Sequence, residues 1–212
     1  MIADGDLYEL GMLSQNGFSD LQGTFENLPL DTYADDRLRS RRYSSYKFKD
    51  GALEIQGRKD FMQSKEINDY LGDVHRQYEE IEDILLQNDA FLKMFETFQK
   101  QTGLSAESVI EAHQLRWHCR GSVKDPAPEG NHQDGFDYIG IFMVDTFNVD
   151  GGEVMLFKRS DSPPMFKKKL ERGEFVILND RELFHNASPL VPTANEEDGH
   201  WDVIVLTANN AA

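Results

Sequence analysis

Cysteine, basic residues and long apolar runs are all scarce in this chain of 212 residues. The one cysteine, Cys119, cannot form an intrachain disulfide, which favours a cytoplasmic location. No run approaches the roughly 20 apolar residues that a membrane-spanning helix needs, so we expect no membrane partner. The first residues, MIADGDLYEL, lack the basic region and the long apolar core of a signal peptide.

The shortage of positive charge limits which kinds of molecule the chain can be expected to bind. Lysine and arginine together number 22, against 38 aspartate and glutamate residues, and the formal net charge is −16. Such a chain has no basic surplus to neutralise phosphates, so we expect no nucleic acid partner. A small-molecule substrate remains, and an anionic one would need arginines in its pocket. The sequence leaves open whether the chain forms a homo-oligomer.

We interpret the 212 residues as one domain with a mainly helical N-terminal part, residues 1–105. LYELGML (7–13) is expected to form a short helix. Residues 75–100 carry apolar side chains at helical spacing, which predicts one long helix or two consecutive helices broken near Asn88. Between them lies DDRLRSRRYSSYKF (35–48), in which residues 43–48 alternate as a strand does.

Residues 106–212 are expected to form a β-rich core, which makes the fold class α+β. Short β-type runs follow one another here, separated by turns rich in Gly, Pro, Asp and Asn. These runs are 109–119, 137–148, 153–159, 173–180, 182–188 and 202–208. Many short strands with such turns are typical of a sandwich or a jelly roll.

One His-x-Asp pair with a later histidine fits a metal site. Residues i and i+2 of a strand point to the same face, so His132 and Asp134 can aim at one point. His185 lies in another short strand and can complete the set. Two histidines and one carboxylate form the facial triad of non-haem Fe(II) oxygenases. The alternative is a surface or capping role for these three residues. The remaining histidines, His75, His113, His118 and His200, are interpreted as surface or core residues.

Several motifs in a fixed order resemble a known family. PAPEGNHQDGFDYIG, GGE, LNDRELFHNASPL and DVIVLT, with RSRRYSSY, FMQSKE and HQLR upstream, are similar to bacterial 2-oxoglutarate–Fe(II) dioxygenases that include the L-isoleucine 4-hydroxylases. The resemblance covers residues 39–208. It implies a double-stranded β-helix with N-terminal helices packed on it, and Fe(II) at His132, Asp134 and His185. It also implies 2-oxoglutarate and dioxygen as co-substrates, and a free amino acid or a related molecule as the substrate to be hydroxylated.

The chain departs from that family at one position. The family has an arginine just before the Asp of the last core strand, where it binds the distal carboxylate of 2-oxoglutarate. Here that stretch reads DGHWDVIVLT, and Trp201 stands in the place of the arginine. Tryptophan offers one neutral N–H donor and no charge. Another cation has replaced the arginine, or the co-substrate differs, or catalysis is lost; otherwise Trp201 is a core residue and the match is offset by one position.

The candidates for a replacement cation are Arg41, Arg42, Arg116, Arg120 and Lys158. We select Arg116, because strand alternation in HQLRWHC would let it face into the barrel with Gln114. Arg116 could bind 2-oxoglutarate or the carboxylate of an amino-acid substrate. Arg41 and Gln63 are further candidates for substrate contacts. The alternatives are a surface arginine at position 116 and a loop residue at position 63.

Three functions therefore remain. The first is an Fe(II)- and 2-oxoglutarate-dependent dioxygenase that hydroxylates or otherwise oxidises a small amino-acid-like substrate. The second is an iron oxygenase that does not use 2-oxoglutarate, which Trp201 favours. The third is a non-catalytic jelly roll that binds a metal or a small molecule.

Overall fold

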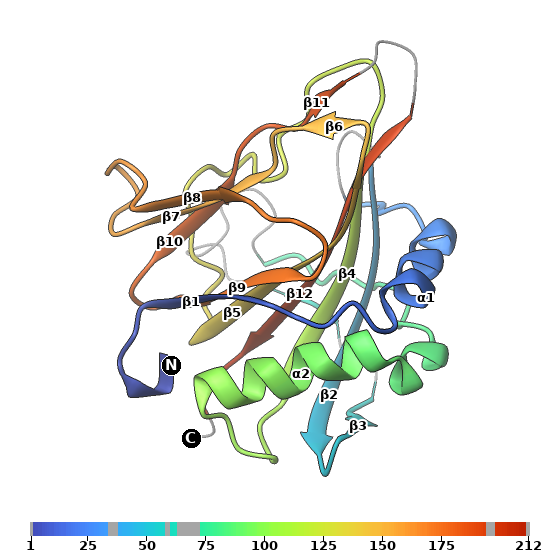
Figure 1. Ribbon diagram of the computed structural model, residues 1–212, viewed down its shortest axis with the longest axis vertical. Coiled ribbons are helices and arrows are strands. Elements are labelled where there is room, and N and C mark those ends of the chain that lie inside the picture. Colours follow the sequence, from blue (N-terminus) through green and yellow to red (C-terminus); the bar gives the residue numbers. More distant parts are fainter. Residues whose placement is uncertain (1, 34–37, 58–59, 63–72, 194–197, 211–212) are drawn as a thin grey trace.

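Helices, a large sheet and a small sheet form three layers in the computed structural model, which describes residues 2–33, 38–57, 60–62, 73–193 and 198–210 (Figure 1). The helices of the described residues are α1 (Phe18–Gly23) and α2 (Asp89–Thr102), with the 3-10 helices η1 (Ile2–Asp4), η2 (Thr24–Asn27) and η3 (Asp83–Gln87). The strands are β1 (Tyr8–Met12), β2 (Arg39–Lys49), β3 (Ala52–Ile55), β4 (Ile110–Cys119), β5 (Tyr138–Phe147), β6 (Val149–Asp150), β7 (Glu153–Phe157), β8 (Phe166–Lys169), β9 (Glu174–Asn179), β10 (Phe184–Ala187), β11 (Val191–Pro192) and β12 (Gly199–Ala208).

The large sheet has seven antiparallel strands in the order β1-β9-β5-β12-β4-β2-β3. β12 lies at its centre and pairs with β4 over its whole length, so that Trp201 lies opposite Trp117. Because side chains alternate along a strand, β12 contributes side chains to the hydrophobic core on each face of the large sheet. Trp201 and Val203 pack on the side of the small sheet, whereas Ile204 packs on the side of the helices.

The small sheet, in the order β10-β7-β8, covers the inner face of the large sheet. Val154 and Leu156 of β7 pack there against Ile141 and Val176 of the large sheet. The short pair β6-β11 extends this half of the molecule (Figure 1). Two facing antiparallel sheets of this kind form a double-stranded β-helix, so the fold predicted from the sequence is confirmed.

α2 crosses the other face of the large sheet (Figure 1). It buries Phe91, Phe95 and Phe98 there, which repeat at helical spacing. Asn88 caps its N-terminus, because Oδ1 of Asn88 accepts a hydrogen bond of 3.0 Å from the backbone N–H of Phe91. The helix ends at Gly103, whose φ of 72° lies in the left-handed region. The predicted break near Asn88 is confirmed, but before it only the 3-10 helix η3 forms, and residues 75–82, which were expected to be helical, are not.

The N-terminal part differs from the mainly helical structure expected for residues 1–105. It contributes β1, β2 and β3 to the large sheet in addition to α1 and α2. The helix expected at residues 7–13 is wrong: Tyr8–Met12 is a strand that pairs with β9. Backbone pairing with an existing sheet edge outweighs the weak helical spacing of this short segment. The strand expected at residues 43–48 is confirmed as part of β2, which begins earlier, at Arg39.

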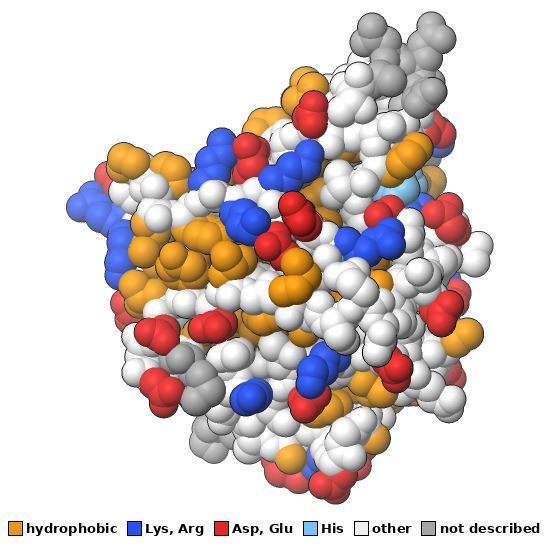
Figure 2. Space-filling view, viewed as in Figure 1, with side chains coloured by type: hydrophobic (Ala, Val, Ile, Leu, Met, Phe, Trp, Pro, Cys, Tyr) orange, Lys and Arg blue, Asp and Glu red, His pale blue; other side chains and the backbone are white. Residues whose placement is uncertain are grey.

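The visible surface mixes both signs of charge. Figure 2 shows acidic and basic side chains interspersed across this face, with a hydrophobic patch between β1 and β8. The edges of the two sheets meet there through Tyr8 and Phe166, whose ring centroids are 5.1 Å apart. Among the described residues, no helix is long and apolar enough to cross a membrane.

Candidate metal centre and its cavity

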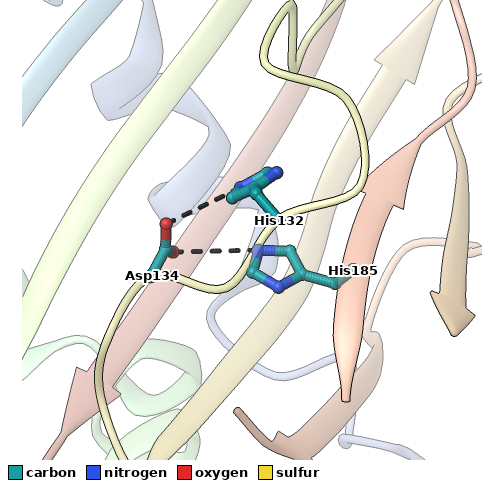
Figure 3. Close-up of side chains that lie close together, drawn as sticks. All are labelled: His132, Asp134 and His185. Atoms are coloured by element: carbon teal, nitrogen blue, oxygen red, sulfur yellow. Dashed lines mark ion pairs between the residues drawn. The ribbon is translucent and has the colours of Figure 1, made fainter. Parts of the chain in front are cut away.

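Two histidines and one aspartate converge from two separate segments (Figure 3). His132 and Asp134 lie in the loop before β5, and His185 lies on β10. The Asp134 carboxylate is 3.6 Å from Nε2 of His132 and 3.8 Å from Nε2 of His185. One ligand atom from each residue lies within 4.8 Å of the other two. The donor set fits Fe(II), because two imidazole nitrogens and one carboxylate oxygen leave the other coordination positions open.

Backbone pairing holds the two histidines side by side. The N–H of His132 donates to the carbonyl of His185 at 3.1 Å, and the N–H of His185 donates to the carbonyl of His132 at 2.8 Å. Their ring centroids are 4.3 Å apart as a result. Gly130 and Gly135 flank the His-x-Asp segment with φ values of 81° and 86°. These left-handed conformations favour glycine, which the sequence EGNHQDG supplies at both positions.

Each imidazole has its Nδ1 facing an oxygen and its Nε2 facing Asp134, but Nδ1 of His185 makes no hydrogen bond. Nδ1 of His132 lies 2.8 Å from the carbonyl oxygen of Gly130, and a carbonyl can only accept, so Nδ1 carries the proton. Nδ1 of His185 lies 3.5 Å from the Asp180 carboxylate. Burial lowers the pKa of the His185 imidazole, but Asp180 and Asp134 outweigh it and raise this pKa above its ordinary value. Both Nε2 atoms are therefore placed as donors to a shared ion.

Asp180 is a residue that the sequence reasoning missed. It is 1% exposed, and its carboxylate accepts hydrogen bonds from the backbone N–H groups of Asp134, Gly135 and Phe136 at 3.3, 2.9 and 3.2 Å. One carboxylate thus fixes the loop that carries Asp134 and also faces His185. The available signal was the polar pair Asn179–Asp180, which follows the apolar run FVIL (175–178) at the end of β9.

A cavity of about 410 Å³ lies between the two sheets, and the three side chains form part of its wall. Much of the remaining wall is apolar. Charged side chains of both signs also line it. Its cations are Arg39, Arg41, Arg76 and Lys124, and its carboxylates are Asp125, Glu129 and Asp134. A small polar molecule could therefore contact the candidate metal ligands and a cation at the same time.

Arg116, selected from the sequence as the replacement cation, does not line this cavity. Its guanidinium makes two hydrogen bonds of 2.7 Å to the Asp202 carboxylate and one of 3.0 Å to Glu26. Burial lowers the pKa of the guanidinium, but these carboxylates outweigh it and raise the pKa of Arg116 above its ordinary value. Strand alternation places Leu115 and Trp117 toward the cavity, so Arg116 faces the helical layer. The expected co-substrate or substrate role of Arg116 is therefore corrected to a structural one.

Among the other cations proposed from the sequence, Arg41 lines the cavity, whereas Arg42, Arg120 and Lys158 do not. Arg42 and Arg120 pair with surface carboxylates instead. Gln63, the other candidate for a substrate contact, lies outside the described residues. Arg41 is thus the sequence-derived cation that the fold places in the same cavity as the candidate metal ligands.

Trp201 faces the cavity and is 4% exposed. Its ring centroid lies 5.1 Å from that of Trp117 on the neighbouring strand. A Cβ atom on Gly152 would lie 3.0 Å from Nε1 of Trp201, so the indole packs closely against the backbone of the DGG turn. This position therefore offers bulk and one N–H but no positive charge.

Three further cavity residues were missed or given only a structural interpretation. His113, interpreted as a surface or core residue, is 3% exposed and lines the cavity with Phe61 and Arg76. The alternation of His113, Leu115 and Trp117 was the available signal for His113. Phe61 opens the FMQSKE motif and Arg76 lies in the segment expected to be helical, but neither pattern identified them as cavity residues.

A second group of possible ligands, Asp145, His200 and Asp202, is a charge network. Asp202 is held by Arg116, and the Asp145 carboxylate accepts hydrogen bonds from Arg172 at 2.6 Å and from His200 at 3.0 Å. Burial raises the pKa of the Asp145 carboxyl, but these donors outweigh it and lower this pKa overall. Because protein cations already neutralise both carboxylates, this group lacks the open donor set of the first one.

Comparisons with known proteins agree with this geometry. The family model of 2OG-Fe dioxygenases matches residues 22–207. No curated protein sequence matches the chain significantly.

Solved structures with the same fold include a bsmA homologue from Methylobium petroleophilum PM1, with 25% identity and a TM-score of 0.77 over 92% of this chain and 81% of that one. IDO from Bacillus thuringiensis has 17% identity and a TM-score of 0.78 over 99% of this chain and 96% of that one. TqaL, an Fe(II)/α-ketoglutarate-dependent dioxygenase, has 14% identity and a TM-score of 0.70 over 97% of this chain and 83% of that one.

Proposed function

Because the chain belongs to the 2OG-Fe dioxygenase family, which uses Fe(II), 2-oxoglutarate and dioxygen, we propose that it hydroxylates or otherwise oxidises a small amino-acid-like substrate at an iron held by His132, Asp134 and His185. The observation that carries this proposal is the convergence of these three side chains on the wall of a cavity. Family membership supports catalysis over simple binding, and 2-oxoglutarate over a different co-substrate.

The roles of the residues follow from their positions. Nε2 of His132, Nε2 of His185 and the Asp134 carboxylate would hold the ion from one side. Bound Fe(II), with 2-oxoglutarate and dioxygen, would supply the oxidising power to replace a hydrogen atom on an unactivated carbon with a hydroxyl group. The protein orients the substrate carbon and excludes water, for which the apolar walls of the cavity are suited.

The charge pattern of the cavity supports an amino-acid-like substrate. An amino acid carries an ammonium and a carboxylate on one carbon, so it needs a carboxylate and a cation in the same pocket. Glu129, with a side chain that is 25% exposed, lies 3.7 Å from His132, and Arg41 lines the same cavity. A volume of about 410 Å³ suits small molecules rather than peptides or nucleic acids.

An assay of succinate and oxidised product tests this proposal. Purified protein with Fe(II), 2-oxoglutarate and ascorbate is incubated in air with each of the common L-amino acids, and mass spectrometry follows the products. We expect a product 16 mass units heavier for at least one amino acid, with one succinate formed per turnover. The His185→Ala variant should form none of it. A wild-type protein that binds Fe(II) but oxidises no amino acid would contradict the proposed substrate class.

A further inference from the structure

Arg41 is buried, and no carboxylate of the described residues pairs with it. Its side chain lies on β2 and is 7% exposed. Nη2 of Arg41 is 2.6 Å from Nδ1 of His113, and Nη1 is 3.5 Å from the hydroxyl of Tyr78. Among the described residues, Nε of Arg41 has no hydrogen-bond partner and no carboxylate lies within ion-pair distance of the guanidinium. Burying an unpaired charge costs free energy, unless a ligand of opposite charge binds to it.

Aromatic rings and a second arginine surround this guanidinium. The Cζ of Arg41 lies 4.4 Å from the ring centroid of Tyr78 and 4.8 Å from that of Phe61. The Cζ of Arg76, which is 2% exposed, lies 4.5 Å from the same Phe61 ring. Cation–π contacts hold both groups in place but leave two like charges close together. A carboxylate in the cavity could therefore contact both guanidinium groups.

The neighbouring groups that the structure describes do not neutralise Arg41. Burial, followed by the charge of Arg41, lowers the pKa of His113 well below its ordinary value, so this imidazole is neutral and its Nδ1 accepts from Arg41. Asp31 acts on Arg41 at longer range, but its carboxylate is bound by Arg39 through two hydrogen bonds of 2.9 and 2.7 Å. Burial accordingly lowers the pKa of the Arg41 guanidinium. The excess positive charge therefore stays in the cavity wall.

Arg41, Arg76 and His113 line the same cavity as the candidate metal ligands. We propose that Arg41 and Arg76 form a carboxylate-binding subsite for a small organic acid held at the metal, on β2 and the segment before η3 rather than on the last core strand. Two ligands share this chemistry: the distal carboxylate of 2-oxoglutarate, and the carboxylate of the amino-acid-like substrate. The inference rests on the proposed function, because it needs a metal centre that binds such acids.

Calorimetry on Mn(II)-loaded protein tests the subsite. The variant is Arg41→Gln, and the matched control is Arg42→Gln, which removes a neighbouring arginine of β2 that pairs with Glu79 and Glu82. The first ligand pair is 2-oxoglutarate and 2-oxovalerate, which lacks the distal carboxylate. If the subsite binds 2-oxoglutarate, Arg41→Gln lowers the affinity for 2-oxoglutarate by about 10- to 100-fold and leaves the affinity for 2-oxovalerate unchanged.

The second ligand pair tests the substrate. The L-amino acid that most raises the melting temperature of the Mn(II)- and 2-oxoglutarate-loaded protein is titrated as the acid and as its amide. If the subsite binds the substrate, Arg41→Gln leaves the affinity for 2-oxoglutarate unchanged and lowers the affinity for the amino acid by about 10- to 100-fold. The amide should then bind weakly to the wild type already. Unchanged affinity for 2-oxoglutarate, with no amino acid whose binding depends on Arg41, would overturn the proposal.

Two further measurements separate the loss of this subsite from a loss of metal, of folding or of general charge. Affinity for Mn(II) itself should be the same in the wild type and in Arg41→Gln; a wild type that does not bind Mn(II) would contradict the proposed function rather than the subsite. If Arg41→Gln does not fold, Arg41→Lys and Arg76→Gln replace it, and each should weaken the same ligand. An equal loss in Arg42→Gln would assign the effect to general charge and overturn the subsite.

Discussion

At the scale of single residues, Asp180 links the two segments of the candidate metal centre, since it binds three backbone N–H groups of one segment and faces His185 on the other. We expect Asp180→Asn to weaken Mn(II) binding by about 10- to 100-fold, because groups behind metal ligands fix their orientation and basicity. Calorimetry measures this change. The control is Asp137→Asn, because Asp137 pairs with Arg181 and lies outside the candidate ligand set. If both variants lose stability alike and neither loses Mn(II) affinity, Asp180 has a structural role only.

The residue scale also shows how far the sequence can predict a site. His132, Asp134 and His185 could be identified because their residue types and spacing carry the chemistry in themselves. The role of Arg116 could not be assigned, because strand alternation distinguishes the two faces of β4 but does not show which of them lines the cavity. That choice depends on Asp202, which lies opposite Arg116 on β12 and binds its guanidinium.

At the scale of elements, α2 depends on its cap. Besides capping Phe91, the Asn88 side chain donates a hydrogen bond of 2.9 Å from Nδ2 to the carbonyl of Gly17. We expect Asn88→Ala to lower the free energy of unfolding by about 1 to 2 kcal/mol, measured by urea denaturation. Asn88→Asp keeps the capping oxygen, loses the donor and adds a negative charge that the helix N-terminus favours and the Gly17 carbonyl opposes, so its stability should fall between those of the wild type and Asn88→Ala. If Asn88→Asp is as unstable as Asn88→Ala, the bond to Gly17 rather than the cap carries the effect.

Helices and strands could be predicted where their side-chain pattern repeats over many residues. α2 and β2 repeat over enough residues to show helical and strand patterns, and the structure contains both. β1 has five residues, and its state is decided by pairing with β9, which lies more than 160 positions away in the chain. A segment of that length takes its conformation from the sheet edge beside it, which a local pattern cannot reveal.

At the scale of the whole molecule, metal binding should be coupled to global stability, because the candidate ligands join the loop before β5 to the small sheet. A metal that binds only the folded state at 100 times its Kd adds about 2.7 kcal/mol to the free energy of unfolding. We expect Mn(II) to give this gain in chelator-treated wild-type protein, with a further gain from 2-oxoglutarate only when Mn(II) is present. Urea denaturation measures both gains.

The acidic surface makes a control for this last prediction essential. A net charge of −16 attracts any divalent cation without a specific site. Such attraction weakens as the Debye length falls to about 8 Å at 0.15 M salt, whereas ion binding by His132, Asp134 and His185 is screened much less. The stabilisation by Mn(II) should therefore persist in 0.15 M NaCl and be absent from the His185→Ala variant. An equal gain in that variant would place the bound ions on the acidic surface rather than at the candidate metal centre.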